Sequence, residues 1–168
     1  MIQDLTQPLP AEALTMRKAA QFAPGHLVFL KEHGVMLRFD IGGGKKHKPM
    51  LLALQLSEGH SIGDALEAEK TSGYFFGTQQ PATLAVRVQE DPNDEISHEG
   101  IKGKIVHFAE GGWRIIGLGL ARPFRQQYFI DPIDWTAKPK PDTAEMLVLD
   151  RWRLSLPLPG GREAAIDV

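Results

Sequence analysis

A segment rich in glycine and lysine is the first place where residue types could bind a ligand. Residues 41–49 read IGGGKKHKP. Glycines let several backbone N–H groups converge, and neighbouring ammonium groups add positive charge, so such a loop can hold an anion. The segment is not a Walker phosphate loop, because it lacks the earlier glycine and the Ser or Thr after the lysine. An anion-binding nest and a solvated hairpin tip both remain open. The candidate residues are Gly43, Gly44, Lys45, Lys46 and Lys48.

Arg122 and Arg125 form a second candidate for binding a phosphate or carboxylate. A guanidinium group is planar and can donate two parallel hydrogen bonds to such an anion. Residues three apart lie on opposite faces of a strand, so these two side chains converge only if Pro123 interrupts the strand.

Motifs for metal binding and covalent catalysis are missing. The chain has no cysteine, which removes disulfides, thiolate nucleophiles and cysteine-based metal sites. The histidines never stand two or four residues apart, and no serine lies in a G-x-S-x-G motif. We therefore expect no metal and no cofactor, and we assign no catalytic residue. The histidines are His26, His33, His47, His60, His98 and His107.

Composition narrows the class of protein. The 168 residues carry 19 Lys and Arg against 21 Asp and Glu, a net charge of -2, which disfavours binding to a nucleic acid polymer. The N-terminus lacks the pattern of a signal peptide, and no apolar run approaches the ~18 residues of a membrane span. We expect a cytoplasmic protein without a membrane span.

Alternating apolar residues predict a mostly β fold, an antiparallel barrel or sandwich of about seven to nine strands. Val35, Leu37 and Phe39 share one face of a predicted strand. Gly117 and Gly119 leave a strip without side chains, where a bend, an aromatic ring or another chain could approach. The predicted strands are residues 27–30, 35–39, 50–56, 83–88, 102–109, 113–120 and 124–130.

Two short helices are expected beside these strands. Pro10 precedes good helix formers, which predicts a helix over residues 10–21. Ser61 and Asp64 have the spacing of a capping box, which predicts a second helix over residues 65–70.

The chain divides into a main domain over residues 1–136 and a C-terminal part over residues 137–168. The latter begins with an extended Pro-Lys-Pro connector and continues into a strand or hairpin. Trp152, Leu154 and Leu156 share one face there, so we expect this part to pack on the main domain.

The stretch GKIVHFAEGGWRIIGL, residues 103–118, has the strongest β pattern and could form a hairpin or a ligand loop. With the upstream ATLAVRV it resembles the core of PilZ domains, six-stranded β-barrels that bind cyclic di-GMP. The ligand loop of that family has Asp or Asn, then Ser or Ala, then Gly, and His107, Ala109 and Gly112 occupy these places, with Glu110 between them. His107 departs from the pattern, and residues 51–86 contain no counterpart of the family's paired arginines. The resemblance therefore implies a degenerate PilZ-like domain.

The leading hypothesis is a non-enzymatic binding or adaptor module, in which the resemblance implies a possible cyclic dinucleotide ligand. Its partner would be another protein or a second copy of the chain. One alternative is a structural subunit of an assembly. Another is an enzyme whose site is assembled from distant residues, with His107 and Glu110 as candidate acid and base.

Overall fold

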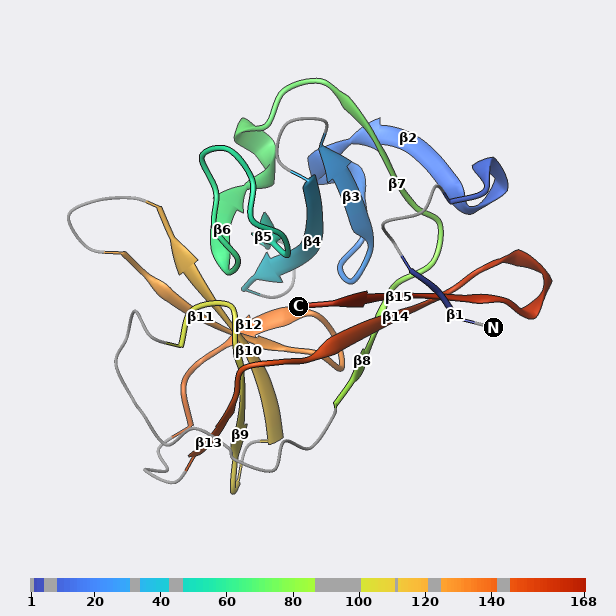
Figure 1. Cartoon of the computed structure of the whole chain (residues 1–168). Helices are drawn as coiled ribbons and strands as arrows, with labels where there is room; N and C mark the ends of the chain where they lie inside the picture. Colours follow the sequence, from blue (N-terminus) through green and yellow to red (C-terminus); the bar gives the residue numbers. More distant parts are fainter. Residues whose placement is uncertain are drawn as a thin grey trace.

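The computed structural model shows a mostly β protein built around a closed barrel of six strands (Figure 1). It describes residues 2–4, 9–30, 34–42, 47–86, 101–110, 112–120, 125–141 and 146–168. The barrel confirms the expected fold class, although the fold as a whole contains more strands than expected and some of the strands pair in parallel. Its strands are β4 (Gly34–Ile41), β5 (Lys48–Ala53), β6 (Asp64–Glu67), β10 (Gly112–Gly119), β11 (Gln127–Asp131) and β12 (Thr136–Lys138).

The barrel consists of two antiparallel three-stranded meanders, β4-β5-β6 and β10-β11-β12. Two parallel pairings join them. At the first seam, between β6 and β10, Asp64 lies opposite Leu118. At the second seam, between β12 and β4, Thr136 lies opposite Asp40. The two meanders therefore have the same internal order and close the barrel through equivalent strand pairs.

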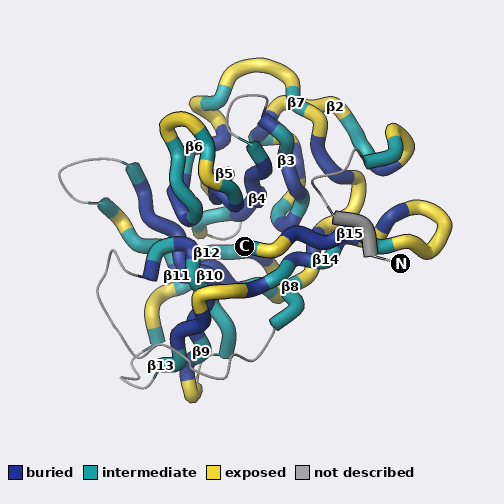
Figure 2. Tube along the Cα trace, in the orientation of Figure 1, coloured by how far each residue is buried: buried dark blue, intermediate teal, exposed yellow. Residues whose placement is uncertain are grey.

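Side chains alternate between the barrel interior and its outer face. On β4, Val35, Leu37 and Phe39 belong to the main core cluster, as their spacing predicts. Met36 and Arg38 face outward yet are fully buried. Ala19, Phe22 and Ala68, which lie between strands, pack in one cluster with Met36 on this face. Figure 2 shows the buried residues concentrated in the barrel strands, with exposed residues mainly in the connections.

Further strands extend the barrel sheet on two sides. From β4 the order continues through β3 (Leu27–Leu30) and β7 (Tyr74–Thr78) to β2 (Leu14–Lys18). From β10 it continues through β9 (Ile105–Phe108) to β13 (Met146–Leu149). A second sheet has the order β1-β15-β14-β8, formed by β1 (Ile2–Asp4), β15 (Glu163–Asp167), β14 (Arg153–Pro157) and β8 (Thr83–Ala85).

The two expected helices are wrong. Within residues 10–21, β2 pairs with β7 between two short 3-10 turns, η1 (Ala11–Ala13) and η2 (Ala19–Gln21). Within residues 65–70, β6 pairs with β5 and is followed by the 3-10 turn η4 (Ala68–Lys70). A further 3-10 turn, η5 (Pro159–Gly161), connects β14 and β15. Tertiary pairing overrides the helix propensity of both segments.

The C-terminal strands lie against the rest of the chain. Trp152, Leu154 and Ile166 belong to the core cluster that includes the barrel interior. The Trp152 indole N–H also donates to the carbonyl oxygen of Gly103, at 2.9 Å. The division expected after residue 136 falls inside β12, so it does not coincide with a linker. None of the described helices has the length and apolar character needed to cross a bilayer.

Candidate functional site

One end of the barrel, which we call the mouth, is defined by strand direction. β4, β6, β10 and β12 end there, whereas β5 and β11 begin there. The register places Glu67 opposite Met50 and Gly119 opposite Ala65. The mouth is therefore assembled from residues that are distant in the sequence.

Interior-facing positions change from apolar to polar, or lose their side chain, as the strands approach the mouth. On β5 the sequence of such positions is Leu52, Met50 and then Lys48. On β6, Ala65 is followed by Glu67. The barrel interior is thus apolar below and charged at its rim.

A groove of about 710 Å³ opens at this mouth. Its volume lies within the range of small-molecule sites, roughly 300–1,000 Å³. Apolar side chains and one glycine form part of its lining, namely Leu30, Met50, Ala65, Leu66, Gly119 and Leu120. The polar lining residues are Lys48, His60, Glu67, Lys70, Thr71, Gln126 and Tyr128.

Three charged side chains meet in the groove, and we call them the mouth cluster: Lys48, Glu67 and Lys70. The Lys48 ammonium group contacts Oε1 of Glu67, and Lys70 Nζ lies 2.8 Å from Oε2. The side chains of Lys48, Glu67 and Lys70 are 49%, 28% and 79% exposed. A single carboxylate therefore bridges two hydrated ammonium groups, which leaves the cluster with a net positive charge.

Mutual attraction shifts the pKa values in the mouth cluster. The hydrogen bond to Glu67 raises the pKa of Lys48. Hydrogen bonds from Lys48 and then Lys70 lower the pKa of Glu67 below its ordinary value. Lys48 and Glu67 are consequently both charged at neutral pH.

Tyr128 borders the cluster and its ring lies beside Gly119. A Cβ atom at Gly119 would lie 3.5 Å from the Tyr128 ring, an ordinary van der Waals distance, so this aromatic neighbour does not by itself require a glycine. The ring also packs on Phe39, with centroids 5.9 Å apart. Burial raises the pKa of Tyr128, opposed by Lys48, so its hydroxyl stays protonated and can donate a hydrogen bond.

The structure describes only some of the residues predicted to bind an anion, and those that it describes lie at or next to this mouth. Lys48 lines the groove, and Arg125 immediately precedes the lining residue Gln126. The other predicted anion-binding residues, Gly43, Gly44, Lys45, Lys46 and Arg122, lie outside the described residues.

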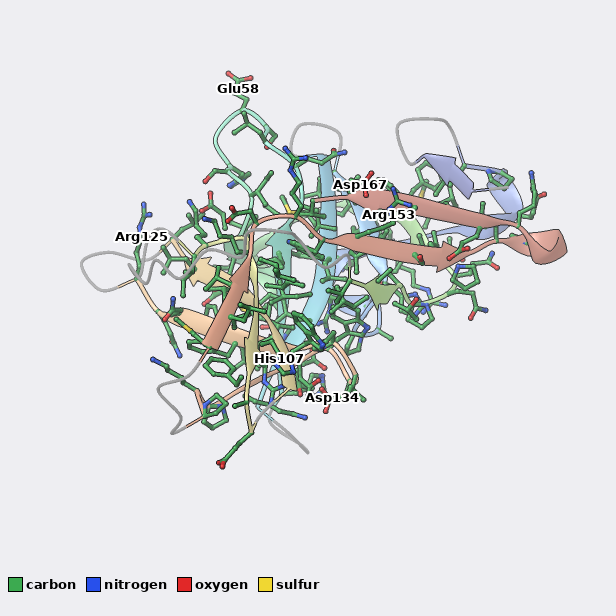
Figure 3. All side chains as sticks on the ribbon, turned by 60° about the horizontal axis from the view of Figure 1, so that its bottom comes forward. Glu58, His107, Arg125, Asp134, Arg153 and Asp167 are labelled. Atoms are coloured by element: carbon green, nitrogen blue, oxygen red, sulfur yellow. The ribbon has the colours of Figure 1, made fainter. Side chains whose placement is uncertain are left out.

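The residues of the resemblance lie at the other end of β10. His107, Ala109, Glu110 and Gly112 belong to the β9–β10 hairpin, where Gly112 pairs with Phe108. Eight strand residues at about 3.3 Å per residue separate this hairpin from the mouth by roughly 20 Å. Figure 3 accordingly shows His107 and Arg125 in different parts of the molecule. Of the predicted ligand residues that the structure describes, those of the hairpin and Arg125 are therefore not brought together.

The hairpin has the features of an exposed turn. Ala109 and Glu110 are exposed, and Gly112 has a φ of +73° with open space where a Cβ would lie. A positive φ favours glycine, which accounts for this residue without a ligand. The His107 ring packs on Trp113, with centroids 4.7 Å apart.

A second group of charges lies on the second meander and consists of Arg114, Asp131 and Lys138. We call it the seam cluster because Lys138 belongs to β12, which pairs with β4 at the second seam. Asp131 Oδ2 lies 2.7 Å from Lys138 Nζ and 3.7 Å from Arg114 Nη1. Its Oδ1 accepts the backbone N–H of Ile133, at 3.0 Å. The Asp131 and Arg114 side chains are only 8% and 11% exposed. This cluster ties β10, β11 and β12 together on the outer face of the second meander.

Sequence reasoning missed Glu67, Lys70 and Tyr128. Their sequence predicts a helix over Glu67 and Lys70, and a helix gives no sign of the cross-strand relation between Glu67 and β5. The alternation of Lys48, Met50 and Leu52 was a usable signal, because it places a lysine on the interior face of a strand.

Among the described residues, no group of three or more His, Asp or Glu side chains is arranged to hold a metal ion. Comparison of the chain with family models, curated proteins and solved structures found no match.

Proposed function

We propose that the protein is a non-enzymatic binding module whose mouth groove holds an anionic small molecule. The observation that carries this proposal is the mouth cluster: Lys48 and Lys70 converge above an apolar barrel interior. Ammonium groups attract a phosphate or carboxylate, while the half-buried side chains of Leu66 and Leu120 can contact an apolar part of the same ligand. The groove thus combines orientation by charge with burial of an organic body.

Cyclic di-GMP is the first ligand to test, because the PilZ resemblance suggested it. The hairpin residues lie far from the groove. Binding in the groove and binding at the β9–β10 hairpin therefore lead to different expected effects of mutations. In our proposal the nucleotide phosphates contact Lys48 and Lys70, and the β9–β10 hairpin does not contribute.

The test is calorimetric titration of the protein with cyclic di-GMP and with GMP, at moderate and high salt. We expect saturable binding that weakens at high salt, since phosphate contacts by lysine are screened. Replacing both Lys48 and Lys70 with Ala should weaken binding by about tenfold or more, roughly 1.4 kcal/mol. Lys104→Ala is the matched control, because Lys104 pairs with Asp150 at 2.7 Å outside the groove.

A second variant separates the two binding places. His107→Ala with Glu110→Ala should leave the affinity unchanged. Loss of binding in this variant, with normal binding in the Lys48 and Lys70 variant, would assign the ligand to the hairpin instead. An absence of heat with both nucleotides at millimolar concentration would contradict nucleotide binding.

A second candidate function, a subunit of an assembly, is favoured by an exposed apolar face on β2 and β7. Met16 lies opposite Phe76, and Tyr74 follows on the same face. These side chains are 56%, 50% and 66% exposed, an unusual grouping of large apolar residues on a surface. Such a face is suited to contact with another protein or a second copy.

The edge of β2 itself is poorly suited to adding a strand. The N–H of Leu14 donates to Ala11, and the Leu14 carbonyl accepts from the Gln79 side chain at 3.2 Å. The N–H of Lys18 donates to the Gln21 side chain, also at 3.2 Å. Because these backbone groups are occupied, contact would use the side-chain face of the ribbon.

Sedimentation velocity tests the assembly function. A stable dimer or larger oligomer that dissociates in Met16→Asp and Phe76→Asp variants would support it, with Leu56→Asp as the control at another exposed apolar position. A monomer at all concentrations would count against self-assembly. Deleting residues 138–168 is a poor test, because it removes Trp152 and Leu154 from the core.

A further inference from the structure

We infer that Glu67 occupies the position that the anionic group of the ligand takes on binding, so that ligand binding displaces the Glu67 carboxylate from Lys48 and Lys70. This inference rests on the proposed function. It specifies how large the anionic group of the ligand is, and it identifies Glu67 as the residue that limits the affinity for that ligand.

The geometry of the mouth cluster defines the size of the anion. Each Glu67 oxygen contacts a different lysine: Oε1 contacts Lys48, and Oε2 lies 2.8 Å from Lys70. The lysines come from β5 and η4, and the carboxylate comes from the end of β6. The ammonium groups are therefore spaced for a group that presents two oxygens side by side, which a carboxylate or a phosphate does.

Exposure makes the Glu67 carboxylate easy to displace. Lys48 and Lys70 are about half and four-fifths exposed, and ion pairs between such hydrated groups are weak. The flexible glutamate side chain can rotate into solvent, where water replaces its lysine partners. The displaced carboxylate then leaves two ammonium groups facing one incoming anion.

The surroundings restrict the ligand to an organic anion. The half-buried Leu66 and Leu120 line the same groove, and the protonated Tyr128 hydroxyl is available as a donor. A ligand that places its phosphate or carboxylate between the lysines can lay an apolar body along these side chains. Inorganic phosphate should therefore bind more weakly than an organic phosphate such as GMP.

The experiment compares the wild type with Glu67→Gln and Glu69→Gln. Glutamine keeps the length of the side chain and removes the competing charge. Glu69 is an exposed neighbour that acts on Lys48 only through a weaker coulombic interaction, so Glu69→Gln makes the same change in net charge without removing the hydrogen-bonded partner of either lysine. Inorganic phosphate, acetate, GMP and octanoate are titrated into each protein and followed by amide shifts in NMR spectra.

We expect Glu67→Gln to bind phosphate and GMP roughly 3- to 10-fold more tightly than the wild type, because two weak competing contacts are lost. Glu69→Gln should stay within about twofold, as expected for a screened charge. A stronger response to the phosphates than to acetate and octanoate would identify the ligand as a phosphate, and the reverse order as a carboxylate.

The inference and the proposed function fail in different ways. Suppose that the wild type binds a probe, the Lys48 and Lys70 variant does not, and Glu67→Gln binds no more tightly than the wild type. Displacement of Glu67 would then be wrong, whereas binding in the groove would still be supported. An equal gain in Glu69→Gln would also overturn it, because the effect would then be general charge. If no protein binds any probe, the proposed function falls, and this inference falls with it.

Discussion

The mouth cluster and the seam cluster have the same composition, one carboxylate between two cations, but differ in burial. Glu67 contacts Lys48 and Lys70 at a hydrated rim, whereas Asp131 and Arg114 are largely buried and only Lys138 reaches water. Asp131 also accepts a backbone N–H from the turn that follows β11. The same set of charges therefore serves two purposes, and the degree of water access separates them.

The difference in burial between the two clusters indicates which ion pairs a ligand can displace. In the seam cluster, removing one partner leaves a buried charge without compensation, which is costly. In the mouth cluster, water compensates each charge, so the pairs exchange readily. A cluster that contributes little to stability is free to respond to a ligand.

The largest expected effect is on the seam cluster. Asp131→Ala should lower the free energy of unfolding by about 3–5 kcal/mol, because Arg114 stays buried without its carboxylate partner. Urea denaturation measures this change. Asp134→Ala is the control: Asp134 is 47% exposed, and its loss should cost only about 1 kcal/mol. Equal effects of the two variants would contradict a special role for burial.

An intermediate effect is expected for Asp64, the buried aspartate of the first seam. Its Oδ2 accepts the N–H of Ser61 at 2.8 Å, and its Oδ1 lies 3.0 Å from Lys102 Nζ. Asp64→Ala should lower the free energy of unfolding by about 2–3 kcal/mol, less than for Asp131, since Lys102 is 20% exposed and can reach water. A urea titration giving a loss of under about 1 kcal/mol would refute this ranking.

A small effect on stability is expected at the mouth. Glu67→Ala should change the melting temperature by less than about 2 °C, because exposed ion pairs contribute little. Differential scanning calorimetry of this variant beside Asp131→Ala measures the contrast directly. A melting temperature lowered as far as in the Asp131 variant would show that the mouth cluster is structural.

The smallest effect is a shift of one titration. Lys48 and Lys70 lower the pKa of Glu67, so Lys48→Ala should move that pKa back toward its ordinary value of 4.5. Carboxyl 13C shifts in an NMR titration measure the pKa of Glu67.

A lowered folded-state pKa stabilises the protein at pH values above the ordinary pKa of the group, and this contribution is lost as the pH falls through the folded-state pKa. The stability difference between wild type and Glu67→Gln should therefore vanish at low pH. An unchanged Glu67 pKa in Lys48→Ala would mean that Lys48 is not its main partner.

The sequence predicted the strands more successfully than the helices. Residues 27–30, 35–39 and 113–120 show clear alternation, and each forms a strand within one or two residues of the prediction. The segments that became β2 and β6 have helical composition, and only their pairing partners reveal them as strands. Parallel pairing at the seams could not be predicted either, since it depends on how the two meanders meet.

For the candidate site, the sequence indicated the chemistry of one residue but not its neighbours. Lys48 was identified by its basic segment, whereas Glu67 and Tyr128 reach it only through strand register. The resemblance directed attention to His107 and Gly112, at the opposite end of β10. Residues that meet across a barrel carry no common signal in a linear sequence.

The two parallel seams have a consequence for how the chain folds. Each meander forms from strands that follow one another along the chain, so it can form early at low cost in loop entropy. Each seam joins strands from different meanders, and closure must wait until both meanders exist. We therefore expect barrel closure to limit the folding rate. The Asp64–Lys102 pair at the first seam would then form after the transition state, and its loss would accelerate unfolding more than it slows folding.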